Sequence, residues 1–361
     1  MPPPKILDTH IHLWPATATS PSNHAWMTPG HFLARQHSAA DYTAATHASA
    51  HAFVYVETDR YLPSAAPPVD PSASAAQLRS ALGAWAREPL GELAFLRGLV
   101  EGEGGGDAGR ARGVVMYAPV HLRGGLLRAY LTLAEEVAGA ELWARVVGVR
   151  YLLQGKRGHE VARMVGGEAW VANVMALREM RGGEGWAFDV GVDVHRDGEG
   201  VLDAIEGFVR EVRRREQGDG KGSVRFVLNH LCKPPFSAPP SPQYLSALTS
   251  LSHDPNVFMK LSGAFNEFST SPSPSTTPST VPSFLASARP FFDHVFSCFP
   301  DRVMFGSDWP VCNVGGPKGE KENWGFWVEV VEGYLEEKGA SEEEKDGVWW
   351  RTGARAYGVD V

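Results

Sequence analysis

Short, continuously apolar runs recur along the chain and alternate with longer segments that mix apolar and polar residues. Because most of the short runs are apolar throughout, both faces of each predicted strand are expected to be covered, as in a parallel sheet. The strands predicted on this pattern are Lys5–His10, Ala52–Glu57, Phe95–Val100, Val146–Leu153, Trp186–Val194, Val224–Asn229, Val257–Leu261 and Arg302–Gly306.

The longer segments between these runs predict helices. They are Ala75–Arg87, Leu126–Val137, Glu168–Met180, Gly200–Glu216, Pro242–Leu251, Phe284–Phe299, Asn323–Lys338 and Ser341–Ala356. Strands that alternate with helices in this way predict an α/β fold, a (β/α)8 barrel of the TIM type.

Segments dominated by Pro, Ser, Thr or Gly fall between the predicted elements. They are Leu62–Ser72, Gly102–Arg110, Gln217–Gly222, Pro234–Pro242 and Ser269–Ser283. Such segments cannot bury enough apolar surface to offset their ordering entropy, so we expect surface loops. None resembles a linker between two folding units, and we predict one barrel domain over residues 1–361 with loop insertions.

Composition and charge narrow the class of protein. The 361 residues are 43% hydrophobic and 21% charged, which is enough apolar material for a large core. A formal net charge of −8 argues against a nucleic-acid partner or an anionic membrane. Three widely spaced cysteines predict no disulfide framework, and no apolar run approaches membrane-spanning length. We therefore expect a cytoplasmic protein with no membrane partner.

Two histidines follow the first apolar run in the sequence Asp8-Thr9-His10-Ile11-His12. Side chains two apart on a strand point the same way, so His10 and His12 are expected to project two imidazoles from one face. Such a pair is half of a zinc-type site. The alternative is a chance pair at the protein surface.

Polar side chains also end most of the other predicted strands. They are Glu57, Asp59 and Arg60, then Arg150, Asp193, His195, His230, Lys260, Ser262 and Asp308. Barrel active sites lie at the carboxyl ends of the strands. Charged groups there are costly unless they are paired, bound to metal or used in catalysis. The pattern therefore predicts an active site at this end.

Five motifs carry a family resemblance, and they occur in the family's order over nearly the whole chain. They are Asp8-Thr9-His10-Ile11-His12-Leu13-Trp14, Gly148-Val149-Arg150, Val227-Leu228-Asn229-His230-Leu231-Cys232-Lys233-Pro234, Lys260-Leu261-Ser262-Gly263 and Phe305-Gly306-Ser307-Asp308-Trp309-Pro310-Val311. The chain resembles the amidohydrolase-related family, and most closely its sugar-lactonase branch of metal-dependent hydrolases. The resemblance implies a (β/α)8 fold with its site at the carboxyl ends of the strands.

The resemblance also implies a role for each matching residue. His10, His12, His230 and Asp308 would bind a divalent metal ion, with zinc expected, and His230 would take part in catalysis. Asp308 would activate water and pass the proton to the ring oxygen of a lactone. Some lactonases of this family act without a tightly bound ion, so a dispensable metal is the alternative. For Asp308 the alternative is a helix N-cap.

Five further residues have both a functional and a structural interpretation. His195 is a candidate catalytic residue or ligand, or a hydrogen-bonded loop residue. Glu57 either contacts a substrate hydroxyl or pairs with an arginine, and Arg150 either binds a substrate oxygen or forms an ion pair. Lys260 either stabilises an oxyanion or pairs with an acid. Trp26 either stacks on a sugar ring or packs its loop.

The function that these expectations favour is hydrolysis of an aldono-lactone, with a small lactone as the substrate, and the sequence does not indicate the oligomeric state. The alternative on the same scaffold is a metal-dependent decarboxylase of an aromatic or muconate-type acid, in which Arg150 would hold the carboxylate. A third possibility is a barrel that has lost catalysis and only binds a ligand.

Overall fold

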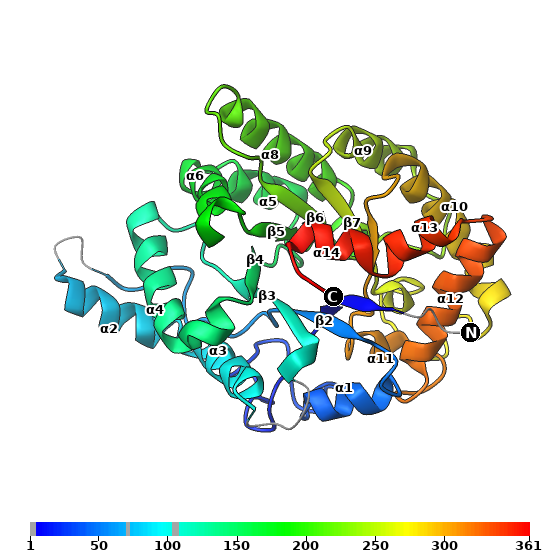
Figure 1. Ribbon diagram of the computed structural model, residues 1–361, viewed down its shortest axis with the longest axis horizontal. Coiled ribbons are helices and arrows are strands. Elements are labelled where there is room, and N and C mark those ends of the chain that lie inside the picture. The colour runs from blue at the N-terminus through cyan, green and yellow to red at the C-terminus, as the bar shows by residue number, and fades with distance from the viewer. Residues whose placement is uncertain (1–4, 70–72, 103–107) are drawn as a thin grey trace.

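Eight parallel strands lie side by side in chain order in a computed structural model that describes residues 5–69, 73–102 and 108–361 (Figure 1). The strands are β1 (Leu7–Ile11), β2 (Ala52–Val56), β3 (Ala111–Tyr117), β4 (Val146–Arg150), β5 (Ala187–Val190), β6 (Arg225–Leu228), β7 (Val257–Leu261) and β8 (Val303–Phe305). A parallel bridge between Ile11 and Trp309 brings the end of β8 back to β1. The predicted (β/α)8 barrel is confirmed.

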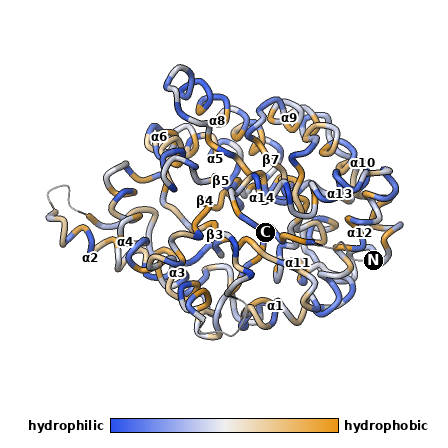
Figure 2. Tube along the Cα trace, viewed as in Figure 1, coloured by the Kyte–Doolittle hydropathy of each residue, from blue (hydrophilic) through white to orange (hydrophobic). Residues whose placement is uncertain are grey.

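Helices surround the strands (Figure 1), and Figure 2 shows that they carry both hydrophobic and hydrophilic residues. Their buried apolar side chains belong to the cluster that packs against the outside of the barrel. They are α1 (Ala39–Ala45), α2 (Ala75–Trp85), α3 (Arg87–Val100), α4 (Gly124–Trp143), α5 (Gly158–Val165), α6 (Glu168–Ala176), α7 (Val194–Asp197), α8 (Gly200–Glu216), α9 (Pro242–Ser252), α10 (Val281–Cys298), α11 (Cys312–Gly315), α12 (Asn323–Glu337), α13 (Glu342–Asp346) and α14 (Thr352–Tyr357). None of the helices in the described ranges is both long and apolar enough to cross a bilayer.

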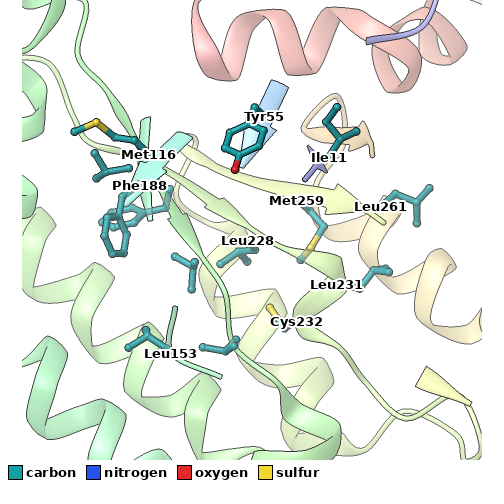
Figure 3. Packing of buried hydrophobic residues seen from close by; sticks show 14 of the residues in the cluster. Ile11, Tyr55, Met116, Leu153, Phe188, Leu228, Leu231, Cys232, Met259 and Leu261 are labelled. Atoms are coloured by element: carbon teal, nitrogen blue, oxygen red, sulfur yellow. The ribbon is translucent and has the colours of Figure 1, made fainter. Parts of the chain in front are cut away.

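The strands are buried on both faces, as their apolar sequences predict. Their outward side chains pack against the helices, and Figure 3 shows Tyr55, Phe188 and Met259 among them. A second cluster fills the amino-terminal end of the barrel interior; its buried members are Leu7, Ala52, Val54, Val56, Val115, Val147, Ala187, Val227, Phe258, Met304, Ala356 and Tyr357. Apolar packing thus closes that end and leaves the other for polar groups.

The predicted strand Phe95–Val100 is wrong, because this segment is the second half of α3. The helix buries Leu93, Leu96 and Val100, a spacing of three and four residues that a six-residue apolar window hides. The third strand is β3, which follows the Gly-rich segment. Gly113 within it lies so close to β4 that a Cβ there would meet Val147 Cγ2 at 2.8 Å.

The other predicted strands and helices are present within a few residues of their expected limits. Helices α1, α3, α5, α7 and α11 were not predicted, and the single helix predicted over Ser341–Ala356 is divided into α13, a π-helical turn and α14. Residues 70–72 and 103–107, within two of the predicted loops, lie outside the described residues. The predicted loop Ser269–Ser283 is bound to the barrel by Thr277, whose hydroxyl donates to the Phe265 carbonyl at 2.9 Å.

Candidate active site

A cavity of about 540 Å³ lies at the carboxyl ends of the strands. Its floor contains His12, His230 and Asp308. Its remaining walls are formed by Trp14, Trp26, His31, Leu33, Thr58, Asp59, Arg150, Leu152, Gln154, Gly155, Asp193, Arg196, Lys233, Asn266, Pro272, Val311 and Val314. The structure therefore brings the sequence-predicted residues of β1, β6 and β8 to one place.

His10 and His12 do share one side of β1. Their Nε2 atoms are 3.2 Å apart, and both rings are buried. The Nδ1 of His12 lies 2.8 Å from the carbonyl of Val56, which can only accept a hydrogen bond. His12 therefore carries a proton on Nδ1, and its Nε2 faces Asp308 Oδ1 at 3.3 Å.

Asp308 follows β8, and its carboxylate faces three imidazoles. Its Oδ1 lies 3.3 Å from His12 Nε2, 3.7 Å from His10 Nε2 and 3.8 Å from His230 Nε2. Burial acts to raise the pKa of Asp308, but His230 and His12 outweigh it and hold that pKa below its usual value. Asp308 is therefore ionised at neutral pH.

The backbone of Asp308 is held in an unusual conformation, with φ of +61°. Its N–H donates to the carbonyl of His10 at 2.8 Å, which fixes the carboxylate beside β1. Helix α11 begins after Val311 and has no side-chain cap. The N-cap interpretation of Asp308 is therefore wrong.

His230 begins a run of four consecutive left-handed residues after β6, from His230 to Lys233, with φ between 53° and 61°. Non-glycine residues rarely adopt this conformation, and such strain concentrates at functional sites. The run aims His230 at Asp308, while its Nδ1 contacts the Ser262 hydroxyl at 2.8 Å. Burial lowers the pKa of His230 to about 3, so the ring is neutral.

The donor set fits a divalent metal ion. One ligand atom from each of His10, His12 and Asp308 lies within 4.8 Å of the others. Ligand atoms about 2.0–2.2 Å from a tetrahedral ion lie about 3.3 Å from one another, close to the spacing of the two Nε2 atoms. Two imidazoles and one carboxylate also suit a borderline-soft divalent ion.

Lys260 and Glu57 lie behind the cavity wall instead of lining it. The Lys260 ammonium is fully buried, 2.7 Å from Asp189 Oδ2 and 3.2 Å from His10 Nδ1. Glu57 is also fully buried and accepts a 2.6 Å hydrogen bond from Arg150 Nε. Each residue was predicted either to contact the substrate or to form an ion pair, and the structure shows the ion pair in both cases, because a buried charge requires a partner. Arg150, by contrast, borders the cavity.

His195 lies outside the group around Asp308. Its Nδ1 contacts Glu267 Oε2 at 3.1 Å, and its backbone N–H donates to the carbonyl of Lys233. Of the two interpretations of His195 given above, these contacts agree with the structural one, a hydrogen-bonded residue after the strand. Trp26 does line the cavity, and its indole N–H donates to the Thr58 carbonyl at 3.1 Å.

Sequence reasoning missed several residues of the cavity wall. Lys233 belongs to one of the five motifs but was given no role. It lies five residues after the end of β6, and the sequence does not show that a left-handed turn brings it back to the cavity. His31 follows none of the predicted strands and was not among the candidates, yet it borders the cavity. Asp59 and Asp193 were noted at strand ends but given no role, and both border the cavity.

Comparison with known proteins identifies relatives of this chain. A family model described as amidohydrolase matches residues 7–359. An L-rhamnono-gamma-lactonase of Scheffersomyces stipitis is 23% identical over 260 residues, which are 69% of each chain. An L-fucono-1,5-lactonase of Burkholderia ambifaria is 33% identical over 107 residues, 29% of this chain and 33% of the relative.

A solved amidohydrolase from Burkholderia multivorans with bound zinc shares the fold. It is 23% identical, has a TM-score of 0.68, and the match covers 99% of this chain and 100% of that one.

Proposed function

Because this chain belongs to the amidohydrolase family, we propose that it hydrolyses a sugar-derived lactone, such as L-rhamnono- or L-fucono-lactone, to the open-chain acid. The observation that carries this proposal is the contact of Asp308 with three imidazoles at the floor of the cavity. This arrangement places a general base and the donor atoms of a metal site within reach of one bound molecule. The two curated lactonases support a lactone ester as the bond that breaks.

In this proposal His10, His12 and Asp308 hold a divalent ion, with His230 beside them. When bound, such an ion polarises a carbonyl and lowers the pKa of water. Zinc suits two imidazoles and a carboxylate, and the solved relative with bound zinc supports that choice. In a metal-free form of the same reaction, Asp308 and the cations of the cavity would act alone.

Asp308 is the proposed general base. Its ionised carboxylate accepts a proton from the water that attacks the carbonyl carbon of the lactone. The bond between that carbon and the ring oxygen then breaks. Asp308 returns the proton to the ring oxygen, which becomes a hydroxyl group of the product acid.

Lys233 takes the role that the sequence suggested for Lys260, stabilising the negative charge that develops on the carbonyl oxygen. Its ammonium lines the cavity and lies 3.5 Å from Glu267 Oε1 and 3.9 Å from Asp193 Oδ2. These distances exceed those of a charged hydrogen bond, so the ammonium keeps donors for a substrate oxygen.

The charges of the cavity favour a neutral, hydroxyl-bearing substrate. Every described cation of the wall has a carboxylate within 4 Å, the pairs being Arg150–Glu57, Arg196–Asp193 and Lys233–Glu267. Asp59 also borders the cavity and has no such ion pair among the described residues. Its carboxylate is an acceptor for substrate hydroxyls, and Trp26 offers an aromatic face to a sugar ring.

The decarboxylase alternative requires a cation whose charge no carboxylate of the protein already balances, so that it can hold a substrate carboxylate. Arg150 was the candidate, but Glu57 already engages it through a 2.6 Å hydrogen bond. The balanced charges of the cavity wall therefore favour the lactone over an aromatic or muconate-type acid.

The test combines metal analysis with an activity assay. Metal content of the purified protein is measured by plasma mass spectrometry, and acid release from a panel of aldono-lactones is followed with a pH indicator, with and without chelator. We expect one divalent ion per chain and chelator-sensitive acid release. Acid release without metal would support the metal-free form, whereas metal without turnover of any lactone would contradict the proposed function.

A further inference from the structure

Tyr357 enters the barrel from the end opposite the cavity. Helix α14 lies across this end (Figure 1), and the fully buried ring of Tyr357 packs with the inner apolar cluster that includes Leu7 and Val54. Its hydroxyl is 2.7 Å from Asp189 Oδ1 on β5. Burial raises the pKa of Tyr357 well above its usual range, so this hydroxyl remains a donor.

Asp189 receives hydrogen bonds on both of its carboxylate oxygens. Tyr357 donates to Oδ1, whereas Lys260 Nζ and Asn229 Nδ2 donate to Oδ2 at 2.7 Å and 3.0 Å. Donors on both oxygens fix the rotation of the carboxylate. Without the Tyr357 hydroxyl, Oδ1 would stay buried but lose this hydrogen bond, which is costly for a carboxylate oxygen.

The Lys260 ammonium is therefore positioned by Tyr357 in two ways. Tyr357 orients the carboxylate that pairs with it, and the Tyr357 ring centroid lies 5.2 Å from Nζ, within cation–π range. The same Nζ lies 3.2 Å from Nδ1 of His10, to which an ammonium can only donate, so in the metal-free protein this ring carries its proton on Nε2, and a bound ion would displace that proton. Contacts thus run without a break from the C-terminal helix to the imidazole beside Asp308.

We propose that Tyr357 is a positioning residue for the active site, which fixes the ring of His10 through Asp189 and Lys260. Groups that orient a ligand or catalytic histidine from behind contribute about 10- to 100-fold to metal affinity or activity. The effect on turnover rests on the proposed function, whereas the effect on the His10 ring does not.

The experiment compares Tyr357→Phe with Tyr334→Phe in the full chain. Tyr334 is a matched control, because it is also fully buried and donates to a carboxylate, Asp293 Oδ1 at 2.9 Å, but among the outer helices. The primary readout is the ¹⁵N chemical shift of the His10 ring in metal-free protein, assigned with a His10→Asn variant. Zinc affinity is then measured by competition with a chromophoric chelator, and kcat and KM on the lactone panel follow.

We expect Tyr357→Phe to shift the His10 ring resonances, weaken zinc binding about tenfold and lower kcat about tenfold with little change in KM. Tyr334→Phe should change none of these. Unchanged His10 resonances in Tyr357→Phe would overturn the proposal, even if its melting temperature falls. A wild-type protein that turns over no lactone would contradict the proposed function instead, and the resonance comparison would still decide the role of Tyr357.

Asp189→Asn provides a second variant should Tyr357→Phe fail to fold. It keeps the size of the side chain but removes the charge that pairs with Lys260, so the same His10 resonances should move. If they do not, the route through Asp189 is wrong.

Discussion

At the scale of single residues, the site depends on side chains held close to one another by unusual backbone. Asp308 and the His230–Lys233 run are left-handed, and each brings a polar side chain to the cavity. This strain is tolerated because the surrounding barrel fixes the ends of both segments. Single substitutions here should therefore change catalysis more than stability.

Asp308→Asn should lower kcat about a thousandfold, because an amide keeps the shape of the carboxylate but cannot accept the proton from water. The fold and most of the bound metal should remain, since His10 and His12 are unchanged. Stopped-flow kinetics and metal analysis test both statements. Asp59→Asn, another carboxylate of the cavity wall, should raise KM with a much smaller effect on kcat. A fully active Asp308→Asn protein would exclude the proposed mechanism.

Gly263→Ala should disable the site through His230. A Cβ at this position would lie 2.7 Å from His230 Nδ1 and 3.1 Å from Asp308 Oδ2, so the imidazole must move, at a cost of about 100-fold in kcat. Gly339→Ala is the control, because Gly339 has a similar φ of +70° and nothing within 4 Å of its would-be Cβ. Both variants should lose stability in urea titrations, but only Gly263→Ala should lose activity. Equal kcat values in the two variants would contradict this account.

Residue identity was predictable where chemistry follows a strand end directly. His10, His12, His230 and Asp308 were found in this way. For Lys260 the sequence left an oxyanion contact and an ion pair open, because strand alternation tells that a side chain points into the barrel but not how deep it lies. Lys233 was missed for the opposite reason, since it reaches the cavity through a turn that non-glycine residues seldom form.

At the scale of elements, helix α14, which follows the last strand in the sequence, covers one end of the barrel. Helix α14 packs directly on β1 at Gly353, where a Cβ would meet Thr9 Cγ2 at 2.5 Å and Leu7 Cδ2 at 3.1 Å. Thr9 cannot easily withdraw, because its hydroxyl donates to the Phe305 carbonyl at 2.6 Å. The packing of α14 on β1 therefore depends on the absence of a side chain at Gly353.

Gly353→Ala should lower the free energy of unfolding by about 1–3 kcal/mol, because the overpacked contact outweighs the better helix propensity of alanine. Gly207→Ala in α8 is the matched control. Its Cβ would meet nothing within 4 Å, so it should stabilise by up to about 1 kcal/mol. Chemical denaturation measures both changes, and a stabilised Gly353→Ala protein would show that α14 is loosely seated.

The error at Phe95–Val100 shows why element type failed at one place. The window contained four apolar residues, one arginine and one glycine, which suit a short buried strand as well as half a helix. The preceding turns of α3 bury Leu90 and Leu93 and reveal the helical spacing, but only over a longer window. The predicted number of eight strands was still correct, because β3, which was not predicted, follows the false strand.

At the scale of the whole molecule, buried histidines make stability depend on pH. Burial lowers the pKa of His24 to about 2 and that of His37 to about 4. Both rings take up protons more readily in the unfolded chain, whose histidines titrate near pH 6.5. Their contribution is therefore complete above pH 6.5 and is lost as the pH falls, down to about 4 for His37 and further for His24.

We expect the free energy of unfolding to decrease steadily between pH 6.5 and pH 4, by up to about 1.4 kcal/mol per pH unit for each such histidine. Urea titrations across this range measure the slope. His24→Gln should make the slope shallower, whereas His159→Gln should not, since His159 is exposed in the folded state. Identical slopes in the two variants would contradict the assignment to buried histidines.

The pairing between β1 and the segment after β8 has a consequence for folding during synthesis. His12 donates its backbone N–H to the Trp309 carbonyl, and Asp308 donates its own to the His10 carbonyl, so the proposed catalytic groups come from segments far apart in the sequence. Such non-local pairing slows folding. During synthesis the His-x-His strand leaves the ribosome well before Asp308. The proposed site therefore cannot assemble until β8 and Asp308 have emerged.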